Sequence, residues 1–110
     1  MDSREKGKRG ERELAGVLRS YGYDTRRGVQ YKGGPESPDV AGLPGVHIEC
    51  KRVERLNVYD SLDQSVRDAG EDEIPVVMSR RNHSRWIAHV YLDDFMEMYR
   101  IWELYREEER

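Results

Sequence analysis

Cysteine and long apolar runs are the scarcest features of this 110-residue chain. Cys50 is the single cysteine, so no disulfide can form within the chain. No apolar run approaches the roughly 20 residues that a membrane helix needs, and no segment resembles a signal peptide. We therefore expect one domain over residues 1–110, with residues 1–4 and 107–110 frayed. We expect it in the cytoplasm of a bacterial, archaeal or phage-infected cell, away from membranes.

Metal-binding and nucleotide-binding signatures are also missing. The histidines at positions 47, 83 and 89 do not have the spacing of a zinc site, and Cys50 falls in register with apolar strand residues. No glycine-rich segment matches a Walker or dinucleotide fingerprint. The sequence thus argues against zinc chemistry, thiol catalysis and a nucleotide cofactor.

Charge is abundant but unevenly distributed. Charged residues make up 37% of the chain and the formal net charge is −3. Residues 1–32 hold nine Lys or Arg against five acidic residues, a net charge of +4, whereas residues 93–110 carry −4. A local basic face governs nucleic-acid contact more than the total charge does. The basic first third is therefore a candidate anion-binding face, with an ordinary solvated surface as the alternative.

Hydrophobic periodicity predicts a single mixed α/β unit. Apolar spacing of three and four residues predicts helices over residues 5–21, 58–69 and from Asp93, its N-cap, until the chain frays at 107–109. Alternating or continuous apolar runs predict strands over residues 23–28, 39–43, 46–53, 74–78 and 86–92. Residues 29–37 read as a loop. This order predicts a central mixed sheet flanked by helices.

Two acids and a lysine stand out on the predicted hairpin. Glu49 and Lys51 share one face of a strand, and the tight turn brings Asp39 on the neighbouring strand close to them. Carboxylates on rigid strands suit Mg²⁺, which prefers oxygen ligands and retains water. Lys51 could orient the attacking water and balance charge on a phosphate. The pattern indicates phosphodiester hydrolysis, although such a loose string also occurs on ordinary solvated strands.

These residues resemble the PD-(D/E)xK nuclease motif. The stretch Lys6-Gly7-Lys8-Arg9-Gly10-Glu11-Arg12-Glu13-Leu14-Ala15 is similar to the opening helix of archaeal-type and phage Holliday junction resolvases. The resemblance covers roughly residues 4–92. It implies a restriction-endonuclease-like fold and places the helix carboxylate on Glu11, where periodicity alone leaves Glu11 and Glu13 equivalent. The implied metal ligands are Glu11, Asp39 and Glu49.

The resemblance also implies an activity. It points to a homodimeric, Mg²⁺-dependent endonuclease, with Mn²⁺ as a substitute, that resolves four-way DNA junctions by paired nicks during recombination or repair. The alternatives are a related nickase or nuclease for flaps and other branched DNA, and a catalytically silent DNA-binding module. The sequence departs from the archaeal pattern between Arg27 and Asp39, where it has a longer loop.

Further candidates surround this core. Gln64 resembles a glutamine that related nucleases place beside the metal. Helical spacing puts Gln64 opposite Leu62, Val66 and Ala69, so a solvated side chain is an equally good interpretation. Candidate DNA contacts are basic or aromatic residues near the N-terminus, in or beside the loop at 29–37 and in the turn at 80–85. For the turn at 80–85, an ordinary polar turn without a role in DNA binding is an equally good interpretation. They are Lys6, Lys8, Arg9, Arg26, Arg27, Tyr31, Lys32, Arg80, Arg81 and Arg85.

The last predicted helix carries more large apolar groups than one packing face needs. They are Phe95, Met96, Met98, Tyr99, Ile101, Trp102 and Tyr105. Paired incision of a junction needs one active site for each of two opposed strands, which predicts a homodimer. We expect part of this helix to contact a second subunit. The alternative is that the helix caps its own sheet.

Overall fold

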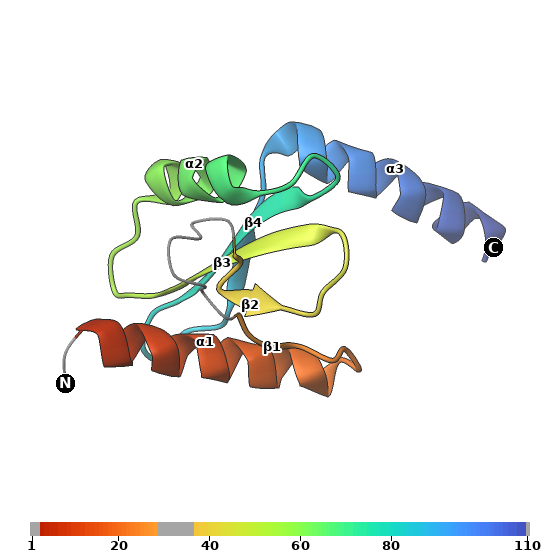
Figure 1. Cartoon of the computed structure of the whole chain (residues 1–110). Coiled ribbons are helices and arrows are strands. Elements are labelled where there is room, and N and C mark those ends of the chain that lie inside the picture. Colours follow the sequence, from red (N-terminus) through yellow and green to blue (C-terminus); the bar gives the residue numbers. More distant parts are fainter. Residues whose placement is uncertain (1–2, 29–36, 110) are drawn as a thin grey trace.

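A computed structural model describes residues 3–28 and 37–109 and shows three helices around a five-stranded mixed sheet in that part of the chain (Figure 1). The elements are, in order, α1 (Ser3–Ser20), β1 (Arg26–Arg27), β2 (Val40–Ala41), β3 (Val46–Arg52), α2 (Val58–Asp68), β4 (Ile74–Arg80), β5 (Ile87–His89) and α3 (Leu92–Glu108). The predicted α/β class is confirmed.

The sheet has the strand order β1-β2-β3-β4-β5. Neighbouring strands are antiparallel except β3 and β4, which run parallel with Glu49 opposite Val77. Parallel strands need a crossover connection, and α2 supplies it. The predicted hairpin is confirmed, because Val40 pairs with Ile48 across the turn at 43–45, where Gly45 adopts a φ of +85°.

Helices α1 and α2 cover opposite faces of the sheet (Figure 1). On the α1 face, Leu14 and Ala15 pack against Val40 and Ile48 in an apolar core. Cys50 packs at the edge of this core, as its strand alternation predicts. Gly10 allows α1 to approach β3 closely, because a Cβ added at this position would lie only 2.6 Å from the Cβ of Arg52.

The α2 face differs from the sequence prediction. Leu62 is buried, as the helical spacing predicts, but Val66 on the same predicted side is 48% exposed, whereas Ser61 and Ser65 are buried. The reason is a hydrogen bond of 3.0 Å from Ser65 Oγ to the carbonyl oxygen of His47, which turns the serine side of α2 toward the sheet. The helix periodicity is right and Leu62 is buried as predicted, but the buried face is rotated away from Val66 toward the serines.

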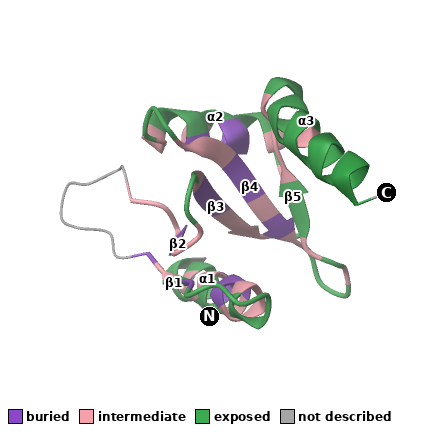
Figure 2. Cartoon of the chain, turned by 90° about the vertical axis from the view of Figure 1, so that its right-hand side faces the viewer, coloured by how far each residue is buried: buried purple, intermediate pink, exposed green. Residues whose placement is uncertain are grey.

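The last helix also differs in its start. Tyr91 occupies the N-cap position without a side-chain capping bond, and Asp93 lies in the first turn instead. The Tyr91 hydroxyl donates to Asp63 Oδ1 at 2.8 Å, which ties the strand-to-helix junction to α2. Asp93 still interacts favourably with the helix dipole. The helix continues through Glu108, projects beyond the sheet and buries none of its residues (Figure 2).

Candidate metal-dependent active site

The sequence-predicted acids and the lysine line one pocket. Its volume is about 450 Å³, and it opens between the start of α1, the approach to β2, the end of β3 and the middle of α2. Its walls include Glu11, Asp39, Glu49, Lys51 and Gln64. These residues are up to 53 positions apart in sequence, so the tertiary fold brings them together.

Asp39 is fixed by the β3 backbone. Its Oδ2 accepts a hydrogen bond of 2.8 Å from the Cys50 amide, and its own amide donates to the Ile48 carbonyl at 2.9 Å. These two bonds hold the Asp39 carboxylate beside Glu49, which follows Ile48 on the same strand. The hairpin therefore sets the distance between the two acids.

Glu49 is an acid held where ionisation is costly. Its residue is 2% exposed. Burial is the main cause that raises the pKa of Glu49 to about 8, followed by the charge of Asp39 and a hydrogen bond between the two carboxyls; the nearby Lys51 acts in the opposite direction. Two carboxyl groups that share a proton in this way are a site where a divalent cation would relieve repulsion.

Glu11 joins this group from α1. Burial and the negative charge of Asp39 raise the pKa of Glu11, while Arg27 lowers it through a hydrogen bond of 2.8 Å from its Nε to Glu11 Oε1. Glu13 lies apart from the pocket, where it pairs with Arg52 at 3.4 Å and with Arg80. The structure therefore separates two acids that helical periodicity left equivalent.

Lys51 and Gln64 face each other across the pocket. Lys51 Nζ lies 3.5 Å from Gln64 Oε1, and Gln64 is half-buried rather than fully solvated. Helical spacing left a solvated Gln64 and a Gln64 beside the site as equal alternatives, because it took Val66 to mark the buried side of α2. The rotated helix instead places Gln64 next to the lysine.

Cys50 is close to the acids but chemically quiet. Burial, assisted by the charge of Asp39, raises the pKa of the Cys50 thiol to about 12. A thiol with such a pKa holds almost no thiolate near neutral pH. Cys50 therefore acts as a small core side chain.

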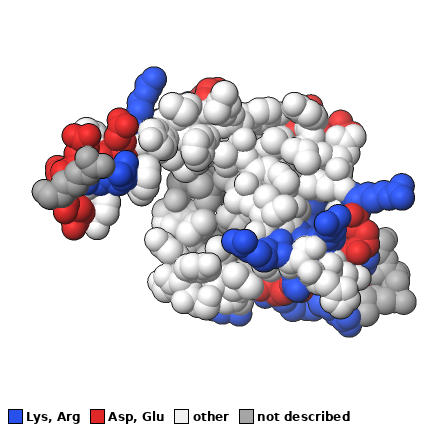
Figure 3. All heavy atoms as spheres, turned by 180° about the vertical axis from the view of Figure 1, so that it is seen from behind, with Lys and Arg blue, Asp and Glu red and all other residues white. Residues whose placement is uncertain are grey.

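The candidate DNA contacts fall into two groups. Arg27 and Arg80 are engaged by Glu11 and Glu13, and Arg80 Nε also donates to the Ser84 carbonyl at 2.7 Å. The exposed ones are Lys6, Arg9, Arg26, Arg81 and Arg85; Lys8 is half-buried and lies 3.7 Å from Glu5. Tyr31 and Lys32 lie outside the described residues. Figure 3 shows Lys and Arg side chains concentrated over the lower part of one face.

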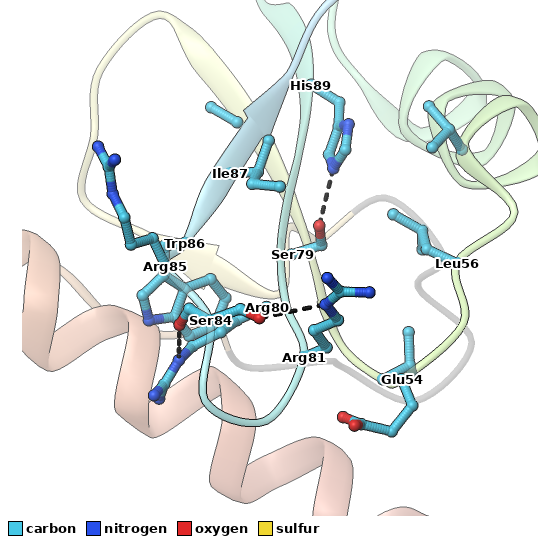
Figure 4. Close-up of a pocket in the computed structure, with 13 residues that line it drawn as sticks. Glu54, Leu56, Ser79, Arg80, Arg81, Ser84, Arg85, Trp86, Ile87 and His89 are labelled. Carbon is cyan, nitrogen blue, oxygen red and sulfur yellow. Dashed lines mark hydrogen bonds between the residues drawn. The ribbon is translucent and has the colours of Figure 1, made fainter.

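A second groove adjoins this basic turn (Figure 4). It has a volume of about 660 Å³ and lies between Leu56 and the β4–β5 hairpin, with Arg81, Arg85 and Trp86 in its wall. At its upper end the Ser79 hydroxyl and His89 Nε2 lie 2.7 Å apart. Burial lowers the pKa of His89, which favours the neutral ring. Among the groove's residues, cationic and aromatic groups predominate at the turn.

Sequence reasoning missed two site features. Arg27 was assigned to DNA rather than to the orientation of Glu11, because the pairing spans 16 residues. Asp68 was not singled out at all, although its charge acts on Glu49. No local pattern signals either contact.

Comparison with known proteins adds no family. No protein-family model, no curated protein and no solved structure matches this chain. Within the described residues, no helix is both long enough and apolar enough to cross a bilayer.

Proposed function

We propose that this protein is a divalent-metal-dependent endodeoxyribonuclease that cuts branched DNA, with four-way junctions as its substrate. The observation that carries the proposal is the convergence of Glu11, Asp39, Glu49 and Lys51 in one pocket. The resemblance of these residues to the PD-(D/E)xK motif, and of residues 6–15 to junction resolvases, supplies the substrate class. The restriction-endonuclease-like assignment of the sheet belongs to the same proposal.

The carboxylates fit a hard divalent cation such as Mg²⁺, with Mn²⁺ as a substitute. Glu11, Asp39 and Glu49 offer only oxygen ligands. Burial, followed by the negative charge of Asp39, raises the pKa of Glu11 and of Glu49, and a bound cation would offset both effects. Arg27 orients Glu11 toward the pocket. When bound, the ion supplies Lewis acidity toward the phosphate and acidifies its coordinated water.

The protein's own groups then position the reactants. Lys51 is placed to hold the attacking water and to balance the charge that develops on the phosphate oxygens. Gln64 restrains the Lys51 ammonium through its side-chain carbonyl. The backbone amide of Cys50 keeps Asp39 in place while the substrate binds. This set is suited to one incision per chain.

DNA is proposed to contact the exposed cations on the edges of the pocket and the β4–β5 turn. Lys6 lines the pocket itself, and Arg81 and Arg85 line the neighbouring groove. Guanidinium groups form paired hydrogen bonds with phosphate oxygens. Arg27 and Arg80 contribute less, because carboxylates already balance their charges.

Replacement of Asp39 tests the activity. Asp39→Asn keeps an oxygen to accept the Cys50 amide hydrogen bond but removes a charged ligand. We expect junction cleavage in Mg²⁺ to fall by at least about 10³-fold while DNA binding is unchanged or tighter, because one negative charge beside phosphate is lost. Cleavage and gel-shift assays on a four-way junction, a flap, a nicked duplex and a linear duplex measure both.

The matched control is Asp72→Asn, which removes an exposed acid from the α2–β4 turn. It should cut like the unmodified chain. Full activity of Asp39→Asn would remove the assignment, and wild-type cleavage of flaps in preference to junctions would select the related branched-DNA nuclease. Binding of DNA by the wild type without any cleavage in Mg²⁺ or Mn²⁺ would contradict the nuclease proposal and support the alternative of a catalytically silent DNA-binding module.

A second copy of this chain is the proposed partner of α3. The alternative that α3 caps its own sheet does not fit a helix with no buried residue. Phe95, Tyr99 and Trp102 instead form a continuous ridge, with ring centroids 6.2 and 5.4 Å apart, and Trp102 is 51% exposed. Two chains joined through such ridges supply the two active sites that paired nicks need.

Trp102→Glu tests this partner. In the single chain the side chain is already half exposed, so the fold should persist, whereas a charge buried between two copies costs several kcal/mol. We expect monomers that nick one strand only, measured by sedimentation at micromolar concentration and by a cruciform-plasmid assay. Arg100→Glu, an exposed position on the same helix, is the control. Paired cuts by a wild-type monomer would contradict the proposal.

A further inference from the structure

A cluster of metal-binding groups lies next to the carboxylate pocket, beneath α2. His47 and Glu49 extend from the same face of β3, and Asp68 reaches them from the last turn of α2. One potential ligand atom from each residue lies within 4.8 Å of the other two. His47 and Glu49 are buried and Asp68 is partly open to solvent. Only Glu49 also lines the pocket described above.

The separation of His47 and Glu49 suits two ligands of one ion. His47 Nε2 and Glu49 Oε1 are 3.3 Å apart. Two ligands of a tetrahedral ion with bonds of about 2.0–2.1 Å are separated by about 3.3 Å. A direct N–H to carboxylate hydrogen bond has a usual length of about 2.9 Å. The observed spacing is therefore closer to a metal coordination edge than to a charge-assisted hydrogen bond.

The second nitrogen of the His47 ring provides independent support. Among the described residues, Nδ1 is buried without a hydrogen-bond partner, and the carboxylate oxygen Glu73 Oε1 lies 3.7 Å from it. That oxygen is held in place by the Gly70 amide, which donates to it at 2.7 Å. A lone pair on Nδ1 would face this carboxylate, so the favourable tautomer carries its hydrogen on Nδ1 and its lone pair on Nε2. The Nε2 lone pair then faces the Glu49 carboxyl, and either a proton on Glu49 or a metal ion between the two groups satisfies this arrangement.

A carboxylate behind the distal ring nitrogen is also how proteins orient metal-binding histidines. Such a partner fixes the tautomer and raises the basicity of the ligating nitrogen. Glu73 occupies that place relative to His47. His47 thus has the carboxylates of Glu49 and Asp68 on its Nε2 side and the carboxylate of Glu73 on its Nδ1 side, as in a metal site whose histidine has an outer carboxylate partner.

We propose that His47, Glu49 and Asp68 bind a divalent transition-metal ion of the Zn²⁺ or Mn²⁺ type. One imidazole and two carboxylates favour such an ion over Mg²⁺ or Ca²⁺, which prefer all-oxygen sites. The partly open side at Asp68 leaves room for a water ligand. The site does not depend on nuclease activity. If the proposed function holds, Glu49 links this ion to the neighbouring carboxylate pocket.

Zinc titration in the Asp39→Asn background tests this site by itself. That background removes an acid of the neighbouring pocket, so zinc binding is measured separately from cleavage. Competition with a chromophoric chelator gives the affinity, and ¹⁵N NMR of the imidazoles reports the ligating nitrogen. We expect one Zn²⁺ per chain, a large shift of the His47 Nε2 resonance, and at least about a tenfold loss of affinity in Asp68→Asn and His47→Gln.

The choice of variants makes the result decisive. Asp68→Asn is nearly isosteric at a partly exposed helix end, so it decides the matter if circular dichroism shows that His47→Gln does not fold. His83→Asn removes an exposed imidazole at a φ of +60°, which asparagine tolerates, and should leave zinc binding unchanged.

Equal zinc affinity in the Asp39→Asn chain with and without the Asp68 and His47 replacements would overturn the site. So would an Nε2 resonance that zinc does not move, because a proton would then bridge His47 and Glu49. Absence of DNA cleavage by the wild type would contradict only the proposed nuclease function, since these titrations do not use cleavage.

Discussion

The two faces of β3 show opposite solutions to burial. Toward α1 the strand presents Ile48 to Leu14 and Ala15, and the contact is apolar. Toward α2 it presents His47 and Glu49, which are as deeply buried but carry ionisable groups. The apolar face gains free energy from the removal of apolar surface from water, whereas the polar face must meet its hydrogen-bonding and charge requirements one by one.

This difference assigns stability to one face and chemistry to the other. On the α2 face, Ser65 satisfies a backbone carbonyl, while the carboxyl of Glu49 is only partly compensated by Lys51. Groups with strongly perturbed protonation cluster at functional sites because chemistry needs them there. The polar face of β3 therefore buries ionisable groups at a cost in stability, and the proposed function uses these groups.

The largest effect should come from the removal of the Glu49 charge. The pKa of Glu49 is raised to about 8 in the folded chain, above its usual 4.5, so the folded state binds the proton more tightly. The contribution of Glu49 to the free energy of unfolding is therefore fully present below about pH 4.5 and is lost as the pH rises through 8. Glu49→Gln should abolish this loss and exceed the wild type by up to about 4 kcal/mol at pH 8, with little difference at pH 4.5.

Urea unfolding between pH 4.5 and 8.5, with chelator present, measures this difference. Glu71→Gln, an exposed acid, serves as the control and should follow the wild type at each pH. If Glu49→Gln and wild type change in parallel across this range, the buried carboxyl does not carry the cost assigned to the polar face.

A smaller effect is expected when the apolar face is disrupted. Leu14 is 1% exposed in the α1 contact. Leu14→Ala should lower the free energy of unfolding by about 3 kcal/mol at every pH, because it leaves a cavity. Ser65→Ala on the other face should cost only about 1 kcal/mol, the value of one hydrogen bond. Denaturant unfolding of the two variants measures both losses. Equal losses of unfolding free energy would contradict the proposed difference between the two faces of β3.

The sequence predicted the elements better than their contacts. The hairpin around residues 43–45 followed from its turn residues and strand alternation, and the register that sets Asp39 beside Glu49 followed from the hairpin. The buried face of α2 was predicted correctly for Leu62 and wrongly for Val66, because apolar spacing assumes an apolar partner. The sheet instead offers the carbonyl of His47, which a serine satisfies.

The start of α3 shows a similar limit. Asp93 is a good N-cap residue by type, yet Tyr91 takes that position, tied to α2 through its hydroxyl. A preference of about 1 kcal/mol at a cap is easily overridden by a tertiary contact. Helix existence was predictable because it depends on many residues, whereas its first residue depends on few.

The sequence by itself determined the alternation of β3, the turn before it and the existence of α1, because each depends on neighbours a few residues apart. Only the tertiary structure decided which acid of α1 enters the pocket, that Gln64 meets Lys51, and that Asp68 joins His47 and Glu49. These contacts join separate elements across the sheet. Their geometry depends on how α1 and α2 pack, which no local pattern in the chain specifies.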